Sequence, residues 1–240
     1  GDAITTGAQN TAVGQGALAA NTTASSNTAV GYQALYDNTT GTQTVAVGTS
    51  ALANNTTANN NVAVGMQTAF STTTGGNNIA MGKQALYYNT TGTSNVAIGH
   101  VAMHLNTTAD NNTSVGYQSL YANTTGAQNT AVGRNALDAN TTASENTAIG
   151  NSAMGNNTTG AENTAVGSAS LFANTTGANN VAIGRDALKA NTTASNNTAV
   201  GYQAGTAVTT GTLNTLIGSL AGDAITTGNS NVAVGYQTLS

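Results

Sequence analysis

One sequence pattern recurs at a constant interval, without a slip, through this chain of 240 residues. Each copy follows the pattern N-[TV]-A-[VI]-G-x-x-A-L-x-x-N-T-T-[GA]-x-x, numbered here as repeat positions 1 to 17. Position 1 falls at residues 10, 27, 44, 61, 78, 95, 112, 129, 146, 163, 180, 197, 214 and 231. Self-similarity at a fixed short period indicates a repeat architecture, in which each copy folds as one structural unit. The sequence therefore predicts a single repeat array over residues 1–240, with a part coil at 1–9, full coils at 10–230 and a part coil at 231–240.

The two ends of the sequence resemble repeat interiors. Gly1–Gly7 is repeated as Gly222–Gly228, and the last residue, Ser240, occupies position 10 of a coil. Repeat arrays need polar capping units at their ends, and neither end has the composition of a cap. We therefore expect these residues to be a slice of a longer fibre.

The apolar residues of each copy indicate short strands. Positions 2 and 4 are mostly β-branched and flank a small residue, which is the alternation typical of a strand. No 3.6-residue periodicity is present. The sequence predicts an all-β fold, a parallel β-solenoid of about 14 stacked coils, with strands near positions 1–4 and 7–10 and a short third one near 12–14. One coil buries too few side chains to be stable alone, so stacking has to stabilise the array.

Glycine occupies position 5 in every copy, which predicts a turn with positive φ or a close backbone approach. These turn glycines are Gly14, Gly31, Gly48, Gly65, Gly82, Gly99, Gly116, Gly133, Gly150, Gly167, Gly184, Gly201, Gly218 and Gly235. Positions 4 and 9 are aliphatic or Met in most copies, so we expect them to form the core. The representative core residues are Val13, Val30, Leu35, Val47, Leu52, Ile98, Leu137 and Ile183.

Position 3 is Ala in all copies but two, where Ser114 and Leu216 replace it. Neighbouring strand residues point to opposite faces, so position 3 is expected to face away from positions 2 and 4. A solvated row would vary among polar residues, and this row does not. Either the coil is thin and flattened, or the Ala row packs on another chain. The second alternative predicts a homo-oligomer.

Composition excludes several classes of protein. Charged residues are 5% of the chain and the net charge is −4, whereas nucleic-acid binding needs a basic face. The longest apolar runs are a few residues, too short for insertion into a membrane. The chain has no Cys, so a thiolate metal site is absent from the sequence.

The segments Asn95–Gly99 and Asn180–Gly184, both with the sequence NVAIG, carry a resemblance. This pattern resembles the repeat of trimeric autotransporter adhesin heads and is also similar to repeats in long phage tail fibres. The resemblance implies a left-handed parallel β-roll with three chains packed about an axis. The repeat of this chain, with its Asn-Thr-Thr insert, is longer than the usual head repeat.

Asn-Thr-Thr fills positions 12 to 14 in ten copies and matches the acceptor pattern for N-glycosylation. The alternative is a ladder of Asn amides bonded from coil to coil. These residues are Asn21, Asn38, Asn55, Asn89, Asn106, Asn123, Asn140, Asn157, Asn174 and Asn191. Ile4, Val208 and Ile225 replace Asn at position 12, which indicates an inward position and favours the ladder.

Three further sets of residues have alternative interpretations. The invariant Thr pair could bind ice through outward hydroxyl rows, or bond along the stack. The aromatic residues of position 10 could contact a glycan or a protein receptor, or cover the Leu row; they are Tyr36, Phe70, Tyr87, Tyr121 and Phe172. His100 and His104 occupy variable positions without recurring carboxylates and are interpreted as surface residues. No acid–base pair or nucleophile recurs, so we expect neither an enzyme nor a cofactor or metal site.

These observations predict an extracellular structural and adhesive fibre shaft, built as a homotrimer or a longer filament of this chain. The expected partners are further copies of the chain and a cell-surface or glycan receptor, with no nucleic acid. A phage tail-fibre shaft for host recognition is the first alternative, and an ice-binding solenoid that uses the Thr rows is the second.

Overall fold

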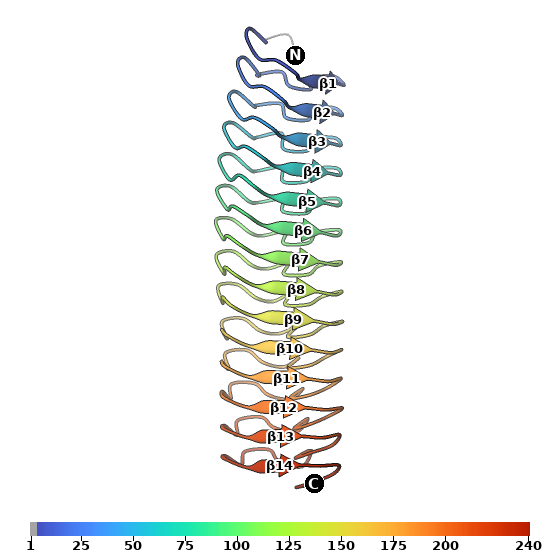
Figure 1. Cartoon of the computed structure of the whole chain (residues 1–240), viewed down its shortest axis with the longest axis vertical. Coiled ribbons are helices and arrows are strands. Elements are labelled where there is room, and N and C mark those ends of the chain that lie inside the picture. The colour runs from blue at the N-terminus through green and yellow to red at the C-terminus, as the bar shows by residue number, and fades with distance from the viewer. Residues whose placement is uncertain (1–3) are drawn as a thin grey trace. The chain divides into compact units, whose positions relative to one another are not determined.

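The computed structural model describes residues 4–240 as coils of a parallel β-solenoid, with no helix among them (Figure 1). The chain divides into two compact units, Gly1–Gln118 and Ser119–Ser240. The strands of the first unit are β1 (Thr11–Val13), β2 (Thr28–Val30), β3 (Val45–Val47), β4 (Val62–Val64), β5 (Ile79–Met81), β6 (Val96–Ile98) and β7 (Thr113–Val115). The strands of the second unit are β8 (Thr130–Val132), β9 (Thr147–Ile149), β10 (Thr164–Val166), β11 (Val181–Ile183), β12 (Thr198–Val200), β13 (Thr215–Ile217) and β14 (Val232–Val234). The predicted fold class is therefore confirmed.

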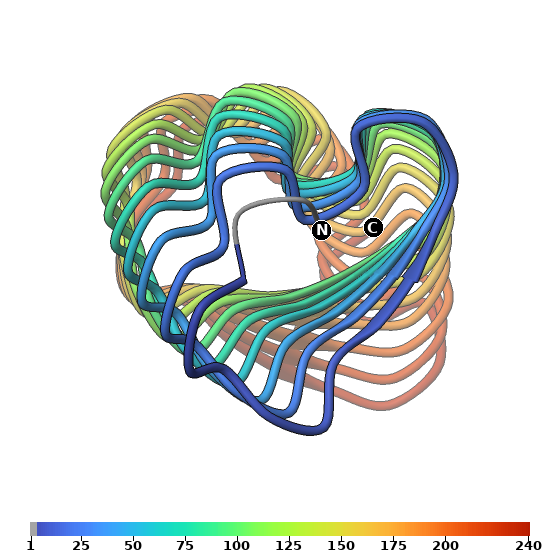
Figure 2. The ribbon, with the colours of Figure 1, turned by 90° about the horizontal axis from the view of Figure 1, so that it is seen from above.

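Within each unit, equivalent residues of successive coils lie side by side. Ala29 pairs with Ala46 in the parallel ladder of β2 and β3, and Ala165 pairs with Ala182 in that of β10 and β11. The members of each pair are one repeat apart, so the register follows the sequence period. Viewed along the stack, successive coils of the first unit follow the same closed outline (Figure 2). Hydrogen-bonded strands of a sheet are typically about 4.8 Å apart.

Each coil contains one strand of three residues, at positions 2 to 4, and the rest of the coil is turn. The strands predicted near positions 7–10 and 12–14 are absent from the described residues. Positions 7, 9 and 17 adopt left-handed backbone conformations, as in Gln33 (φ 53°), Leu35 (φ 50°) and Gln43 (φ 57°). A left-handed residue other than Gly costs roughly 1–2 kcal/mol. Backbone amides in the turn segments form hydrogen bonds to the next coil. For example, the Leu35 amide donates to the Ala51 carbonyl at 3.0 Å.

The glycine of position 5 is required on two counts. Its φ lies between 125° and 142° in all copies, a region that L side chains rarely adopt. A Cβ at Gly150 would also lie 2.5 Å from the carbonyl oxygen of Gly167 in the next coil. The turn and the close backbone approach inferred from the sequence therefore occur together.

The core differs from the prediction in its strand residues. Ala at position 3 points into the coil and is fully buried, as at Ala29, Ala97 and Ala165, together with the Ala of position 8 and the Leu of position 9. Of the predicted core, Leu35, Leu52 and Leu137 are fully buried. The prediction was wrong for the residues of position 4, which lie on the outer face of the strand: Val13, Val30, Val47, Ile98 and Ile183. Of the two alternatives for the Ala row, packing on another chain is wrong, because the narrow coil of a single chain already buries the row.

One pair of coils shows why position 3 is small. Leu216 replaces Ala at position 3 of β13, and position 9 is Gly in its own coil (Gly222) and in the preceding one (Gly205). A Cβ at Gly205 would lie 2.6 Å from Leu216 Cδ1, and one at Gly222 would lie 2.7 Å from Leu216 Cδ2. Positions 3 and 9 therefore share one narrow interior volume, which holds a large side chain from one side only. Close packing of this kind allows Ala opposite Leu, or Leu opposite Gly, but not two large residues.

Candidate interaction surface

The outer face of the sheet carries an apolar row at position 4, beside position 2, which is Thr in eight of the fourteen strands and Val or Ile in the others. Here Ile79 and Met81 of β5 are each 38% exposed, and Ile149 of β9 is 40% exposed. Every strand in each unit contributes a side chain of this kind, so the apolar surface runs along the stack of coils. Large contiguous apolar patches are rare on monomeric proteins and indicate interaction sites.

Two polar edges border this apolar face. Position 6, after the turn glycine, forms one edge, and position 17, before the strand, forms the other. The side chains of position 17 are exposed in every copy, and those of position 6 in nearly every copy. Position 6 carries Tyr32, Met66, Tyr117, Arg134 and Tyr202 among others. Tyr, Met and Arg are enriched in protein–protein interfaces, so the composition of this edge is compatible with an interface.

The Thr pair serves two different purposes. The hydroxyl of position 13 donates to the carbonyl of the Thr one coil further on, as from Thr39 Oγ1 to Thr56 O at 3.0 Å and from Thr158 Oγ1 to Thr175 O at 2.9 Å. The Thr of position 14 is exposed in all described coils, Thr40 being one of them. The bonding along the stack thus accounts for position 13, and one outward Thr row remains at position 14.

The Asn side chains of position 12 are buried and form a ladder. Asn55 Nδ2 donates to Asn38 Oδ1 at 2.8 Å and to the Ala58 carbonyl at 3.2 Å, and Asn174 Nδ2 donates to Asn157 Oδ1 at 2.7 Å. All ten Asn-Thr-Thr asparagines have no exposed surface. A glycan would have to replace one of the amide hydrogens that make these bonds, so the folded coil presents no acceptor at position 12.

The ladder is interrupted where position 12 is not Asn. Thr72 and Val208 replace Asn there, and the amide oxygen of the preceding Asn then loses its donor. Asn55 Oδ1, Thr72 Oγ1 and Asn191 Oδ1 are buried without a hydrogen-bond partner. Leaving such a group unsatisfied costs about 1–3 kcal/mol. These interruptions are therefore local weak points of each unit.

A second Asn ladder, at position 1, was not recognised in the sequence. Asn27 Nδ2 donates to the Gly41 carbonyl at 2.8 Å, and Asn27 Oδ1 accepts the backbone amide of Thr44 at 3.0 Å. The same arrangement recurs in the second unit at Asn163 and Asn180. The sequence signal for this ladder is the near-invariance of Asn at position 1.

Four aromatic side chains of the first unit form a cluster. Phe70 stacks on Tyr87 with ring centroids 5.2 Å apart, and Tyr87 stacks on His104 at 5.3 Å. Tyr88 packs edge-on against both Tyr87 and His104. The ring faces of Tyr87 are therefore directed at its neighbours in adjacent coils. Among the other predicted contact residues, Tyr36 is exposed, whereas Tyr121 and Phe172 are partly buried.

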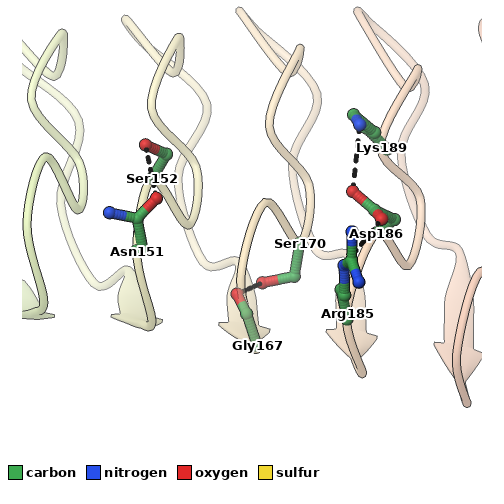
Figure 3. Close-up of polar contacts among 7 residues, drawn as sticks. All are labelled: Asn151, Ser152, Gly167, Ser170, Arg185, Asp186 and Lys189. Atoms are coloured by element: carbon green, nitrogen blue, oxygen red, sulfur yellow. Dashed lines mark hydrogen bonds and ion pairs between the residues drawn. The ribbon is translucent and has the colours of Figure 1, made fainter.

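Charged side chains interact locally in the second unit. Asp186, at position 7, is nearly buried and pairs with Arg185 Nε at 3.3 Å and Lys189 Nζ at 3.0 Å (Figure 3). The same view shows Ser170 Oγ donating to the Gly167 carbonyl at 2.8 Å across the turn. Burial raises the pKa of Asp138, and a hydrogen bond from Asn135 Nδ2 at 3.1 Å partly opposes that shift. Within residues 4–240, His, Asp and Glu side chains nowhere gather in threes as metal ligands would.

Comparison with known protein families, with characterised proteins and with solved structures found no match to this chain. The part of the chain that the structure describes holds no helix long and apolar enough to cross a membrane.

Proposed function

We propose that this chain is the shaft of an extracellular structural and adhesive fibre, in which several copies pack through the outer face of the sheet, with its apolar row at position 4. The main support for the proposal is the exposure of apolar side chains on this face of the sheet. A chain with 5% charged residues leaves Val, Ile and Met exposed on the strands of both units while it buries Ala inside. Association would remove these side chains from water, at roughly 25 cal/mol per Å² of apolar surface buried.

The assembly we propose is a trimer, and its contact face differs from the one inferred from the sequence alone. The Ala row is inside each coil, so the self-association surface is the opposite face of the same strands. The resemblance of NVAIG to adhesin-head and tail-fibre repeats supports a fibre of this kind. A bacterial surface fibre and a phage tail-fibre shaft share this physical argument, and attachment to a cell-surface or glycan receptor is part of the proposal.

Sedimentation equilibrium of the purified chain tests the self-association. We expect an oligomer of defined mass for the unchanged chain. The triple variant Ile149→Ser, Ile183→Ser, Ile217→Ser removes three apolar side chains from one unit and should dissociate it while the β-structure signal in circular dichroism remains. A matched control places three substitutions on the exposed Thr row, as Thr142→Ser, Thr176→Ser and Thr210→Ser, and should leave the mass unchanged. A soluble monomer of the unchanged chain would refute the proposal.

The proposed adhesive role can be tested separately by an attachment assay. Beads coated with the assembled chain should attach to a cell or glycan surface under flow, and uncoated beads should not. Attachment that is equal for coated and uncoated beads on every surface tried would leave a structural shaft without an adhesive role.

A further inference from the structure

The two rows that border the outer face of the sheet carry charges of opposite sign. Three of the four cationic residues of the chain, Lys83, Arg134 and Arg185, occupy position 6, and so does His100. The opposite edge, positions 16 and 17, carries Asp110, Glu145 and Glu162 and no cation. The edge after the strand thus carries Lys83 and His100 in the first unit and Arg134 and Arg185 in the second, where Asp186 of position 7 pairs with Arg185. The edge before the strand carries Asp110 in the first unit and Glu145 and Glu162 in the second.

These opposite charges lie too far apart to pair within one chain. Glu162 and Ser168 mark the two edges at the level of β10, and residues that flank a three-residue strand in this way lie roughly 15–20 Å apart. Within the chain, the nearest ion pairs of the basic edge are local, such as that of Arg185 with Asp186 at 3.3 Å. Asp110 bonds to the Thr93 amide of the preceding coil at 2.6 Å, also on its own edge.

The symmetry of an assembly decides which edges meet. When a second copy is rotated about an axis parallel to the stack of coils, its acidic edge lies beside the basic edge of the first copy. When the second copy is inverted end to end, like edges meet, and Arg134 would face the same row of cations. Opposite charges across an interface favour one register, and like charges exclude the alternative.

We infer that neighbouring copies in the fibre are parallel and meet along a charged seam, in which the position-6 row of one copy lies beside the position-16 and position-17 rows of the next. This inference rests on the proposed self-association and specifies its geometry. Arg134 of one copy lies within one coil of Glu145 of the next, and Arg185 lies within one coil of Glu162. One coil is about 4.8 Å, which an Arg side chain spans. The seam is heterologous, so the rotation has to close into a ring about the fibre axis.

Thiol cross-linking tests the seam directly, because the chain has no Cys of its own. The double variant Glu162→Cys, Ser168→Cys places one thiol on each edge at the level of β10. With a short bis-maleimide reagent it should give covalent oligomers up to the size of the ring on a denaturing gel. The single variants E162C and S168C are the matched controls and should remain uncross-linked. Cross-linked dimers of either single variant would show that like edges meet, and this would overturn the inference.

Charge reversal provides the second readout. Glu145→Lys should weaken the association of the chain about tenfold. A single exposed ion pair contributes little to the free energy of association, but the same pair recurs at every seam of the ring, so its loss is multiplied. Adding Arg134→Glu should restore it, since the double variant again places opposite charges on the seam. The control Asp37→Lys makes the same change of charge at exposed position 11, away from both edges, and should have no such effect.

The outcomes separate this inference from the proposed function. A monomeric unchanged chain refutes the self-association and the seam together. An oligomer that forms normally, but gives no cross-link in the double variant and no rescue by Arg134→Glu, keeps the self-association and refutes the parallel seam.

Discussion

Replacing Thr72 by Asn should repair the Asn ladder of the first unit and stabilise it. Thr72 is fully buried, its hydroxyl has no partner, and Asn55 Oδ1 on one side has lost its donor. Asn89 Nδ2 on the other side donates to the Gly92 carbonyl at 3.0 Å. An Asn at this position would donate to Asn55 Oδ1 and accept from Asn89 Nδ2, as Asn38 and Asn55 do at 2.8 Å.

The expected gain follows from these bonds. Two buried polar atoms cease to be unsatisfied, and each unsatisfied group costs about 1–3 kcal/mol, so we expect Thr72→Asn to raise the unfolding free energy by about 2 kcal/mol. Thermal unfolding should then move to higher temperature by several degrees. Repeat arrays can unfold in parts, so amide hydrogen exchange of Asn55 to Asn89 is the more direct measurement.

Val208→Asn is the matched control for the ladder argument. It offers Asn191 Oδ1 a donor, but Ile225 in the next coil has no amide to bond its own oxygen. The unfolding free energy should therefore rise little or not at all. Asn191 Oδ1 would gain a donor, but the side-chain oxygen of the new Asn would have none, and the apolar contacts of Val208 would be lost. A Thr72→Asn variant that exchanges as fast as the unchanged chain would refute the account of the ladder.

The remaining predictions concern the interior, the turn and one carboxyl group. Leu216→Ala should cost about 2–5 kcal/mol by leaving a cavity, and Gly222→Leu added to it should recover most of the loss, as measured by urea unfolding. Gly150→Ala should lower the unfolding temperature, because its φ is 139° and a Cβ there would meet the next coil; an unchanged melting curve would contradict this. Asp138→Asn should stabilise the chain at neutral pH. Its pKa is raised by burial, so the folded state holds the proton more tightly than the unfolded state, and stability falls as pH rises from the unfolded to the folded pKa. The gain should disappear below both pKa values, and denaturant unfolding across that pH range measures it.

The sequence determined the coil, the stacking and the turn glycines. A period that never slips requires equivalent residues to stack, and the copies act as independent tests of each position. Gly at position 5 in every copy required a backbone that no other residue tolerates. Ile4, Val208 and Ile225 at position 12 indicated an inward position, and the Asn side chains of that row are buried and bonded to one another.

The tertiary structure decided which face of the strand is inside. Alternation along a strand shows that positions 2 and 4 oppose position 3, but it is symmetric with respect to inside and outside. The sequence alone favours burial of the larger side chains of position 4, as in most proteins. A coil this short encloses a narrow volume that Leu35 and its equivalents already fill, so only Ala fits opposite them. The sequence already shows Leu in place of Ala at Leu216 and Gly in place of Leu at Gly205 and Gly222. These substitutions can be explained only when the structure shows that positions 3 and 9 meet across the interior.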